Sequence, residues 1–101
     1  MKKILITGAG GIGGVNFVRA LKIFKDKFFI VGLDFNKYYL EFPDVDVRVN
    51  SPRHSDPNFI KLIHELIKKY DIDFLHPHPS SEALVVSQNL DSITTKTLLP
   101  K

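Results

Sequence analysis

Clustered glycines are the feature of this chain that is best suited to chemistry. Five of its six glycines fall within residues 8–14, directly after a short apolar segment. A strand that leads through glycines into a helix gathers unpaired backbone N–H groups and the positive end of the helix dipole at one point, which favours an anion. The chain therefore predicts an anion-binding turn. The simpler alternative is that the glycines only allow a helix to pack closely on a sheet.

The spacing of these glycines fits two related patterns. Gly8, Gly10 and Gly13 make G-x-G-x-x-G, whereas Gly8, Gly11 and Gly14, with a threonine in front, make T-G-x-x-G-x-x-G. Either pattern is typical of a dinucleotide-binding turn when it follows a strand and opens a helix. The spacing alone does not choose between them.

An acidic residue, Asp34, ends the apolar run that follows the first predicted helix. A carboxylate at that point of a nucleotide-binding unit can bind a ribose 2′-hydroxyl and disfavours a 2′-phosphate. The alternative is that Asp34 only ends a strand. Further along, Tyr38 and Tyr39 lie in a segment without clear period, where they either pack against the sheet or line a ligand.

The four histidines, His54, His64, His76 and His78, raise the question of a metal site. His76 and His78 are two residues apart in an extended segment, so we expect their side chains to point to opposite sides and not to share one ion. We therefore predict no metal site.

Three polar residues open the third predicted helix. Ser80 and Ser81 have no identifiable base, so capping of that helix explains at least one of them better than nucleophilic catalysis does. Glu82 in the first turn suits the helix dipole and is also a candidate substrate contact.

The elements that position these residues alternate between strand and helix. Apolar periodicity predicts strands at 3–7, 28–33, 45–49 and 74–76, and helices at 12–24, from 56–57 to about 70, and from 80 or 81 to about 90. This order indicates the α/β class, with a doubly wound parallel sheet of about four strands in the order 3-2-1-4 and three helices. The tail 92–101 has no predicted partner. The first and fourth strands are then neighbours whose connections leave in opposite directions, so loops 8–14 and 77–82 meet at a crevice.

Length and composition narrow the class of protein. The 101 residues make one domain or part of one, and the absence of cysteine excludes disulfides, thiol catalysis and cysteine-bound metals. No apolar run approaches the roughly 20 residues of a membrane helix, so we expect a cytoplasmic protein that binds no membrane. The net charge of +3 is too thinly spread for nucleic-acid binding. The broad apolar set of the second helix predicts contact with another domain or a homo-oligomer.

Four segments together resemble the N-terminal, Rossmann-like domain of ATP-grasp enzymes, nearest to carbamoyl-phosphate-synthase-like proteins. They are Ile-Leu-Ile-Thr-Gly-Ala-Gly-Gly at 4–11, Val-Gly-Leu-Asp at 31–34, Asp-Ile-Asp-Phe-Leu-His-Pro at 71–77 leading to Ser-Glu at 81–82, and Lys-Thr-Leu-Leu-Pro at 96–100. The resemblance implies one domain over residues 1–101 that is truncated at its C-terminus. It also implies that ATP and magnesium bind to two following domains, and that this domain holds no cofactor and no catalytic residue.

The same resemblance implies a site for a small anionic substrate, in which the parent ligase phosphorylates a carboxylate for attack by an amine. The loop amides that face the substrate would be those of Gly8, Gly10, Gly11, Ile12 and Gly13, and Asn16 would add a side-chain contact. The loop that runs from His78 through Ser80 and Ser81 to Glu82 would form the opposite wall.

A nicotinamide-dependent epimerase or short-chain dehydrogenase is the rival resemblance. In that family Gly8, Gly11, Gly14 and Asp34 would hold NAD. The sequence departs from it in two places: Pro-His-Pro at 77–79 replaces small apolar residues after the fourth strand, and no Tyr-x-x-x-Lys pair is present.

Overall fold

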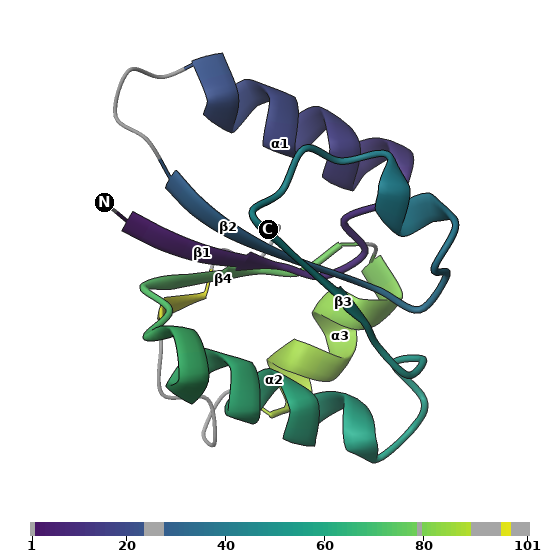
Figure 1. Ribbon diagram of the computed structural model, residues 1–101. Coiled ribbons are helices and arrows are strands. Elements are labelled where there is room, and N and C mark those ends of the chain that lie inside the picture. Colours follow the sequence, from purple (N-terminus) through teal and green to yellow (C-terminus); the bar gives the residue numbers. More distant parts are fainter. Residues whose placement is uncertain (1, 24–27, 79, 90–95, 98–101) are drawn as a thin grey trace.

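A parallel β-sheet runs through the middle of the fold (Figure 1). The computed structural model describes residues 2–23, 28–78, 80–89 and 96–97. The strands are β1 (Lys2–Ile6), β2 (Phe28–Asp34), β3 (Val47–Asn50), β4 (Phe74–His76) and β5 (Lys96–Thr97). They lie in the order β3-β2-β1-β4-β5 and every neighbouring pair is parallel. The predicted doubly wound sheet, with strands in the order 3-2-1-4, is therefore confirmed.

Helical segments cover both faces of this sheet (Figure 1). They are α1 (Ile12–Ile23), the short 3-10 helix η1 (Tyr39–Glu41), α2 (Asn58–Tyr70) and α3 (Ser80–Gln88). α1 and η1 lie on one face, and α2 and α3 lie on the other. Within the described part of the chain, no helix is long and apolar enough to cross a membrane.

Alternation along β1 divides the core between the two faces. Leu5 belongs to the cluster that contains Phe59 of α2, whereas Ile4 and Ile6 belong to the cluster that contains Val18 of α1. Successive side chains of a strand point to opposite faces, so a short apolar run fills both layers. This explains why the first strand is apolar throughout.

The tail holds an element that the sequence did not predict. Lys96 and Thr97 pair in parallel with Phe74 and Leu75, so the sheet has a fifth strand beyond β4. Two residues carry no periodicity, and only the exposed edge of β4 makes them a strand. The rest of the predicted tail, and the end of the third predicted helix at about Leu90, lie outside the described residues.

β3 begins two residues later than the alternation of valines predicts. The Ile30 N–H donates to Asp46 Oδ2 at 2.7 Å, and the Asp46 N–H donates to the Ile30 carbonyl at 2.9 Å. Val45 is buried, but the ladder with β2 starts only at Val47. The alternation of valines thus starts at Val45, two residues before the regular backbone pairing of β3 with β2.

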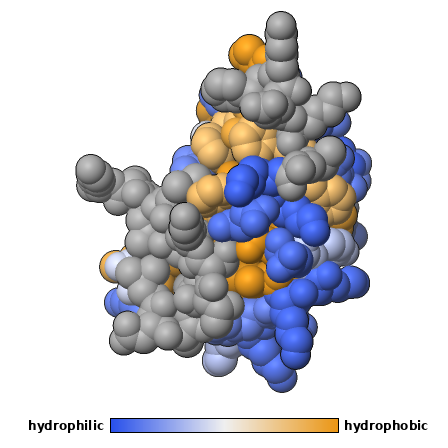
Figure 2. Space-filling model, turned by 90° about the vertical axis from the view of Figure 1, so that its left-hand side faces the viewer, coloured by the Kyte–Doolittle hydropathy of each residue, from blue (hydrophilic) through white to orange (hydrophobic). Residues whose placement is uncertain are grey.

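The apolar set of α2 is largely covered by the chain itself. Phe59, Ile63, Leu66 and Ile67 are buried, and the remaining members pack against the same core cluster. Large apolar side chains are exposed at other places. They are Ile12, Ile23, Phe35, Tyr38, Tyr39, Phe42 and Leu84. Some of these side chains, such as Phe35 directly after β2, lie near the carboxyl ends of the strands. Figure 2 shows the other end of the sheet, where the strands begin. There, hydrophilic side chains cover much of the surface that is not grey.

Asp71 offers a test of the backbone at the end of α2. It adopts φ 54° and ψ 54°, the left-handed region, and its N–H donates to the Ile67 carbonyl. Glycine enters this region without the steric cost that a Cβ brings. Asp71→Gly should therefore keep or raise the free energy of unfolding, by up to about 1 kcal/mol, and Asp71→Ala should lower it by about 1 kcal/mol. Urea unfolding measures both, and a glycine variant less stable than the alanine variant would contradict the assignment.

Candidate functional site

The crevice predicted between the first and fourth strands is present at the carboxyl ends of β1 and β4. After β1 the chain continues to α1 on one face of the sheet, and after β4 it continues to α3 on the other face (Figure 1). The two connecting loops therefore leave neighbouring strands in opposite directions and leave a crevice between them. Thr7 joins them: its carbonyl accepts the His78 N–H at 3.2 Å, and its hydroxyl donates to the His78 carbonyl at 3.1 Å. The predicted meeting of the two loops is thereby confirmed.

Three glycines of the glycine loop, residues 8–14, are required by the fold. Gly8 has φ 61°, the left-handed region. A Cβ on Gly10 would lie 2.4 Å from the Tyr39 carbonyl carbon, and a Cβ on Gly14 would lie 2.4 Å from the Gly8 carbonyl oxygen. Since these neighbours are backbone atoms, no side chain can move aside. Gly10 and Gly14 thus serve close packing, but against Tyr39 of η1 and against the glycine loop itself and not, as the alternative had it, between a helix and the sheet.

The other two glycines have no such internal reason. A Cβ on Gly11 or on Gly13 would meet nothing closer than 3.4 Å, an ordinary contact distance. Among the described residues, the N–H groups of Ile12, Gly13 and Gly14 have no acceptor, as is usual in the first turn of a helix. These donors lie where the helix dipole is positive. The loop can therefore receive an acceptor from outside the chain.

Asp34 holds the glycine loop in place. Its side chain is only 4% exposed, and its Oδ2 accepts the Gly10 N–H at 2.9 Å. Its Oδ1 accepts the Asn36 N–H, also at 2.9 Å. Sequence reasoning treated Asp34 as a strand end or a ribose ligand. The structure adds a bond to the glycine loop, and it leaves the residue on the wall of the crevice.

Glu82, in the first turn of α3, is a buried acid. It is 4% exposed and hydrogen-bonds the Thr7 side chain. Burial, together with the negative charge of Asp34, raises the pKa of Glu82 to about 7, against a smaller opposing effect of the Thr7 hydrogen bond. The position of Glu82 in the sequence indicated a first-turn residue; its burial depends on how α3 packs and has no local signal.

The expectation that the side chains of His76 and His78 point to opposite sides is wrong. Their Nε2 atoms are 2.5 Å apart, and the Phe17 ring stacks on His76 with ring centroids 4.0 Å apart. Side chains alternate only within a strand, and β4 ends at His76, so His78 is free to turn back. Burial lowers the pKa of His78. In the described part of the chain, no three His, Cys, Asp or Glu residues are placed to hold a metal ion.

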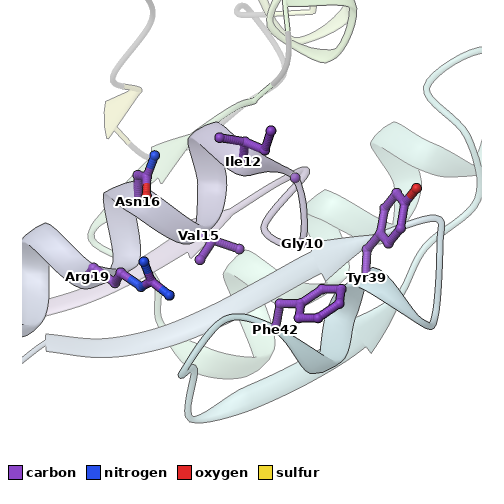
Figure 3. A pocket seen from close by; sticks show the side chains of 8 residues that line it. Gly10, Ile12, Val15, Asn16, Arg19, Tyr39 and Phe42 are labelled. Atoms are coloured by element: carbon purple, nitrogen blue, oxygen red, sulfur yellow. The ribbon is translucent and has the colours of Figure 1, made fainter.

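The glycine loop lines two different hollows on the surface of the protein. One is the crevice, about 240 Å³, whose charged and polar lining side chains are those of Asp34, Tyr39, His78 and Glu82. The other is larger, about 540 Å³, and lies between α1 and η1, so we call it the α1–η1 hollow (Figure 3). Its lining residues are Gly10, Gly11, Ile12, Val15, Asn16, Arg19, Tyr39 and Phe42.

The predicted site residues divide between these hollows. The glycines other than Gly10 line the crevice with His78 and Glu82, whereas Asn16 lines the α1–η1 hollow. Ser81 is exposed and lines neither hollow, so the structure does not bring it to the site. Ser80 begins α3, but its side chain lies outside the described part of the chain.

Sequence reasoning missed two side chains of the site. Phe42 lies in a segment without period, and Arg19 lies on the helix predicted at 12–24 without having been singled out as a site residue. Neither has a local signal, because only the crossing of η1 over the sheet brings Phe42 opposite α1 (Figure 3). Tyr39, for which the sequence left open packing against the sheet or lining a ligand, lines both hollows.

Comparison with known proteins identifies the fold. No family model and no curated protein matches the chain. Among solved structures, it is similar to dTDP-glucose 4,6-dehydratase from Bacillus anthracis in complex with NAD, with a TM-score of 0.69 and 16% identity over 96% of this chain and 36% of the dehydratase. It is also similar to a glycosyltransferase from Rickettsia africae, with a TM-score of 0.66 and 22% identity over 97% of this chain and 29% of the other.

At these identities the shared property is a Rossmann-like fold, and the chain spans about a third of the length of each neighbour. Neither of the two is an ATP-grasp enzyme, so the resemblance seen in the sequence motifs gains no support from them.

Substitution of two neighbouring glycines tests their separate roles. Gly14→Ala should lower the free energy of unfolding by about 1–3 kcal/mol, because its Cβ would overlap backbone atoms. Gly13→Ala is the matched control in the same helix, and it should keep or raise stability by up to about 1 kcal/mol. Thermal or urea unfolding distinguishes them. Equal effects would contradict the packing role of Gly14.

Glu82 predicts how stability depends on pH. Between pH 4.5 and 7 the folded carboxyl keeps a proton that the unfolded chain has lost, so the free energy of unfolding should fall as pH rises through this interval. The total loss in the free energy of unfolding is on the order of 3 kcal/mol for a carboxyl whose pKa rises from 4.5 in the unfolded chain to about 7 in the folded protein. The difference between wild type and Glu82→Gln isolates this effect from that of His78, whose lowered pKa acts in the opposite direction.

Urea unfolding at a series of pH values measures the two proteins in parallel. Glu65→Gln, at an exposed position of α2, is the control and should follow the wild type. If the difference between wild type and Glu82→Gln were constant from pH 4.5 to 8, Glu82 would not hold the proton.

Proposed function

We propose that the glycine loop binds the phosphate or carboxylate group of a small molecule, and that this domain supplies the binding surface to a larger enzyme. One observation carries the proposal: the N–H groups of Ile12, Gly13 and Gly14 have no acceptor among the described residues, and Gly11 and Gly13 leave the space in front of them open. Such donors at the positive end of a helix dipole bind oxyanions.

The α1–η1 hollow is suited to the rest of the ligand. It continues from Gly10 and Gly11, and across it Tyr39 and Phe42 of the η1 region face α1 (Figure 3). Among the described residues, Arg19 forms no ion pair or hydrogen bond, so its charge is available to a second acidic group. A ligand that carries an apolar or ring-shaped part beside its anionic group fits these walls.

A nicotinamide dinucleotide is the candidate ligand that the comparisons favour. The dehydratase with a similar fold was solved in complex with NAD. The order of glycine loop, helix and Asp34 at the end of β2 supports the same ligand here. One feature opposes it: the His78 ring lies close to Gly13, at 3.4 Å from where a Cβ on that glycine would stand. A dinucleotide lying along the crevice would have to displace that ring.

The second candidate is the small anionic substrate of an ATP-grasp ligase, with ATP and magnesium bound by other domains. The observation that favours it is the narrowness of the crevice, about 240 Å³, which is below the range of about 300–1,000 Å³ usual for ligand pockets. His78 and Glu82, from the loop that carries the sequence resemblance, form that narrow wall. In this case the domain orients a substrate and contributes no catalytic group.

Removal of one backbone donor tests the proposal directly. Ile12 is 85% exposed and is the first residue of α1, where proline fits a helix. Ile12→Pro deletes its N–H and should weaken binding of inorganic pyrophosphate at least tenfold, as expected for a hydrogen bond to a charged group of about 1.5–3 kcal/mol. Ile12→Ala keeps the N–H and is the control. Calorimetric titration measures the affinities; equal affinities for the two variants would refute the loop as the anion site.

Thermal melting separates the two candidate ligands. A ligand at 100 times its Kd adds about 2.7 kcal/mol of stability, a rise of roughly 10–20 °C for a domain of this size. If NAD raises the Tm at concentrations at which pyrophosphate does not, the dinucleotide is the ligand. If pyrophosphate and small acyl phosphates raise the Tm and NAD adds nothing, the ligase substrate is favoured.

A further inference from the structure

The charges that line the crevice are a problem for any anion bound there. Two carboxyl groups, those of Asp34 and Glu82, form part of its wall, and the described residues that line it include no lysine or arginine. With both carboxyls ionised, an incoming phosphate or carboxylate would meet two negative charges in a partly buried space. The donors of the glycine loop would have to overcome both.

The two carboxyl groups are held differently. Asp34 accepts backbone N–H groups on both oxygens, from Gly10 and from Asn36. Glu82 is equally buried, but its carboxyl is hydrogen-bonded to the Thr7 hydroxyl. That hydroxyl is already shared, because it donates to the His78 carbonyl and accepts the His78 N–H. Of the two, Glu82 is the one that can be neutral at low cost.

We propose that Glu82 meets the bound anion in its neutral, protonated form, so that ligand and proton bind to the crevice together. The inference rests on the proposed function, because it assigns a positioning residue to the same site. A protonated carboxyl donates one hydrogen bond, so Glu82 adds a donor opposite the N–H groups of the glycine loop. The ligand that this arrangement selects is an oxyanion with acceptors on two sides, a phosphate or a carboxylate.

Other titratable groups also lie near Glu82. Burial lowers the pKa of His78, so this ring is neutral near pH 7 and gains charge only in more acid solution; His76 contacts it from β4. Tyr39 lines the crevice from η1, and Asp34 lines it from β2. The raised pKa of Glu82, about 7, places its change of charge at neutral pH. The Glu82→Gln variant decides whether an affinity that changes around pH 7 reports on this carboxyl.

The test uses sulfate, an anion whose charge is constant from pH 5.5 to 8.5. Its binding is followed by NMR through the backbone amide signals of residues 11–14, at constant ionic strength. For wild type, the affinity should fall about tenfold from pH 6 to pH 8, as expected when a group with a pKa of about 7 must be protonated. Addition of sulfate should in turn raise the pKa read from the Glu82 side-chain carbon signal, because linkage is reciprocal.

Glu82→Gln keeps the shape and the donor of a neutral carboxyl but cannot ionise. It should bind sulfate at pH 8 as tightly as wild type does at pH 6, with no change around pH 7. Glu65→Gln, exposed on α2, should keep the pH dependence of wild type. The amide spectrum of each variant shows whether it is folded, and the carbon titration of wild type needs no variant.

The outcomes distinguish the two levels of the argument. Sulfate binding without pH dependence, or a pH dependence retained in Glu82→Gln, would overturn the role of Glu82 and leave the anion site intact. If neither sulfate nor pyrophosphate moves the amide signals of residues 11–14 at any pH, both the role of Glu82 and the proposed function fail.

Discussion

The hydrogen bond from the Gly10 N–H to Asp34 Oδ2 is the interaction on which the rest of the site depends. It connects the loop after β1 to the end of β2. The other oxygen of the same carboxylate holds the Asn36 N–H, and the Asn36 side chain accepts the N–H groups of Tyr38 and Tyr39. One buried acid thus fixes both the glycine loop and the start of the segment that leads into η1.

The position of that segment determines the shape of the two hollows. Tyr39 packs its backbone against Gly10 so closely that no Cβ fits between them. Tyr39 lies on the wall of both hollows, whereas Gly10 lines only the α1–η1 hollow. The absence of a side chain at Gly10 therefore serves the packing of two chain segments, whereas the absence of one at Gly11 and Gly13 leaves backbone donors accessible. One glycine cluster combines two physical reasons.

Much of the fold follows from local pattern. Leu5, with Ile4 and Ile6 on either side, reads as a strand buried on both faces, and the crossover rule then orders the four longer strands. β5 was not predicted, because two residues are too few to show a pattern of alternating hydrophobicity. Their pairing depends on the edge that β4 offers. The site was predictable where it depends on chain order, as in the meeting of the glycine loop with the loop after β4.

What depends on side-chain packing was not predictable. The burial of Glu82 is decided by the seating of α3, and the contact of His76 with His78 by the turn after the strand ends. Asp34 was correctly placed at a strand end, but its two backbone partners are brought to it by separate segments. Such roles need the distances between elements, which no periodicity contains.

The connection between β2 and β3 has a short 3-10 helix where doubly wound folds usually carry a full helix. Arg48 of β3 anchors it by donating to the carbonyls of Leu40 and Pro43. A segment held at its backbone tolerates change in its outward side chains. In an evolving lineage the residues at positions 39 and 42 can vary to accept new ligands while the oxyanion donors stay as they are, so selectivity and anchoring can be inherited separately.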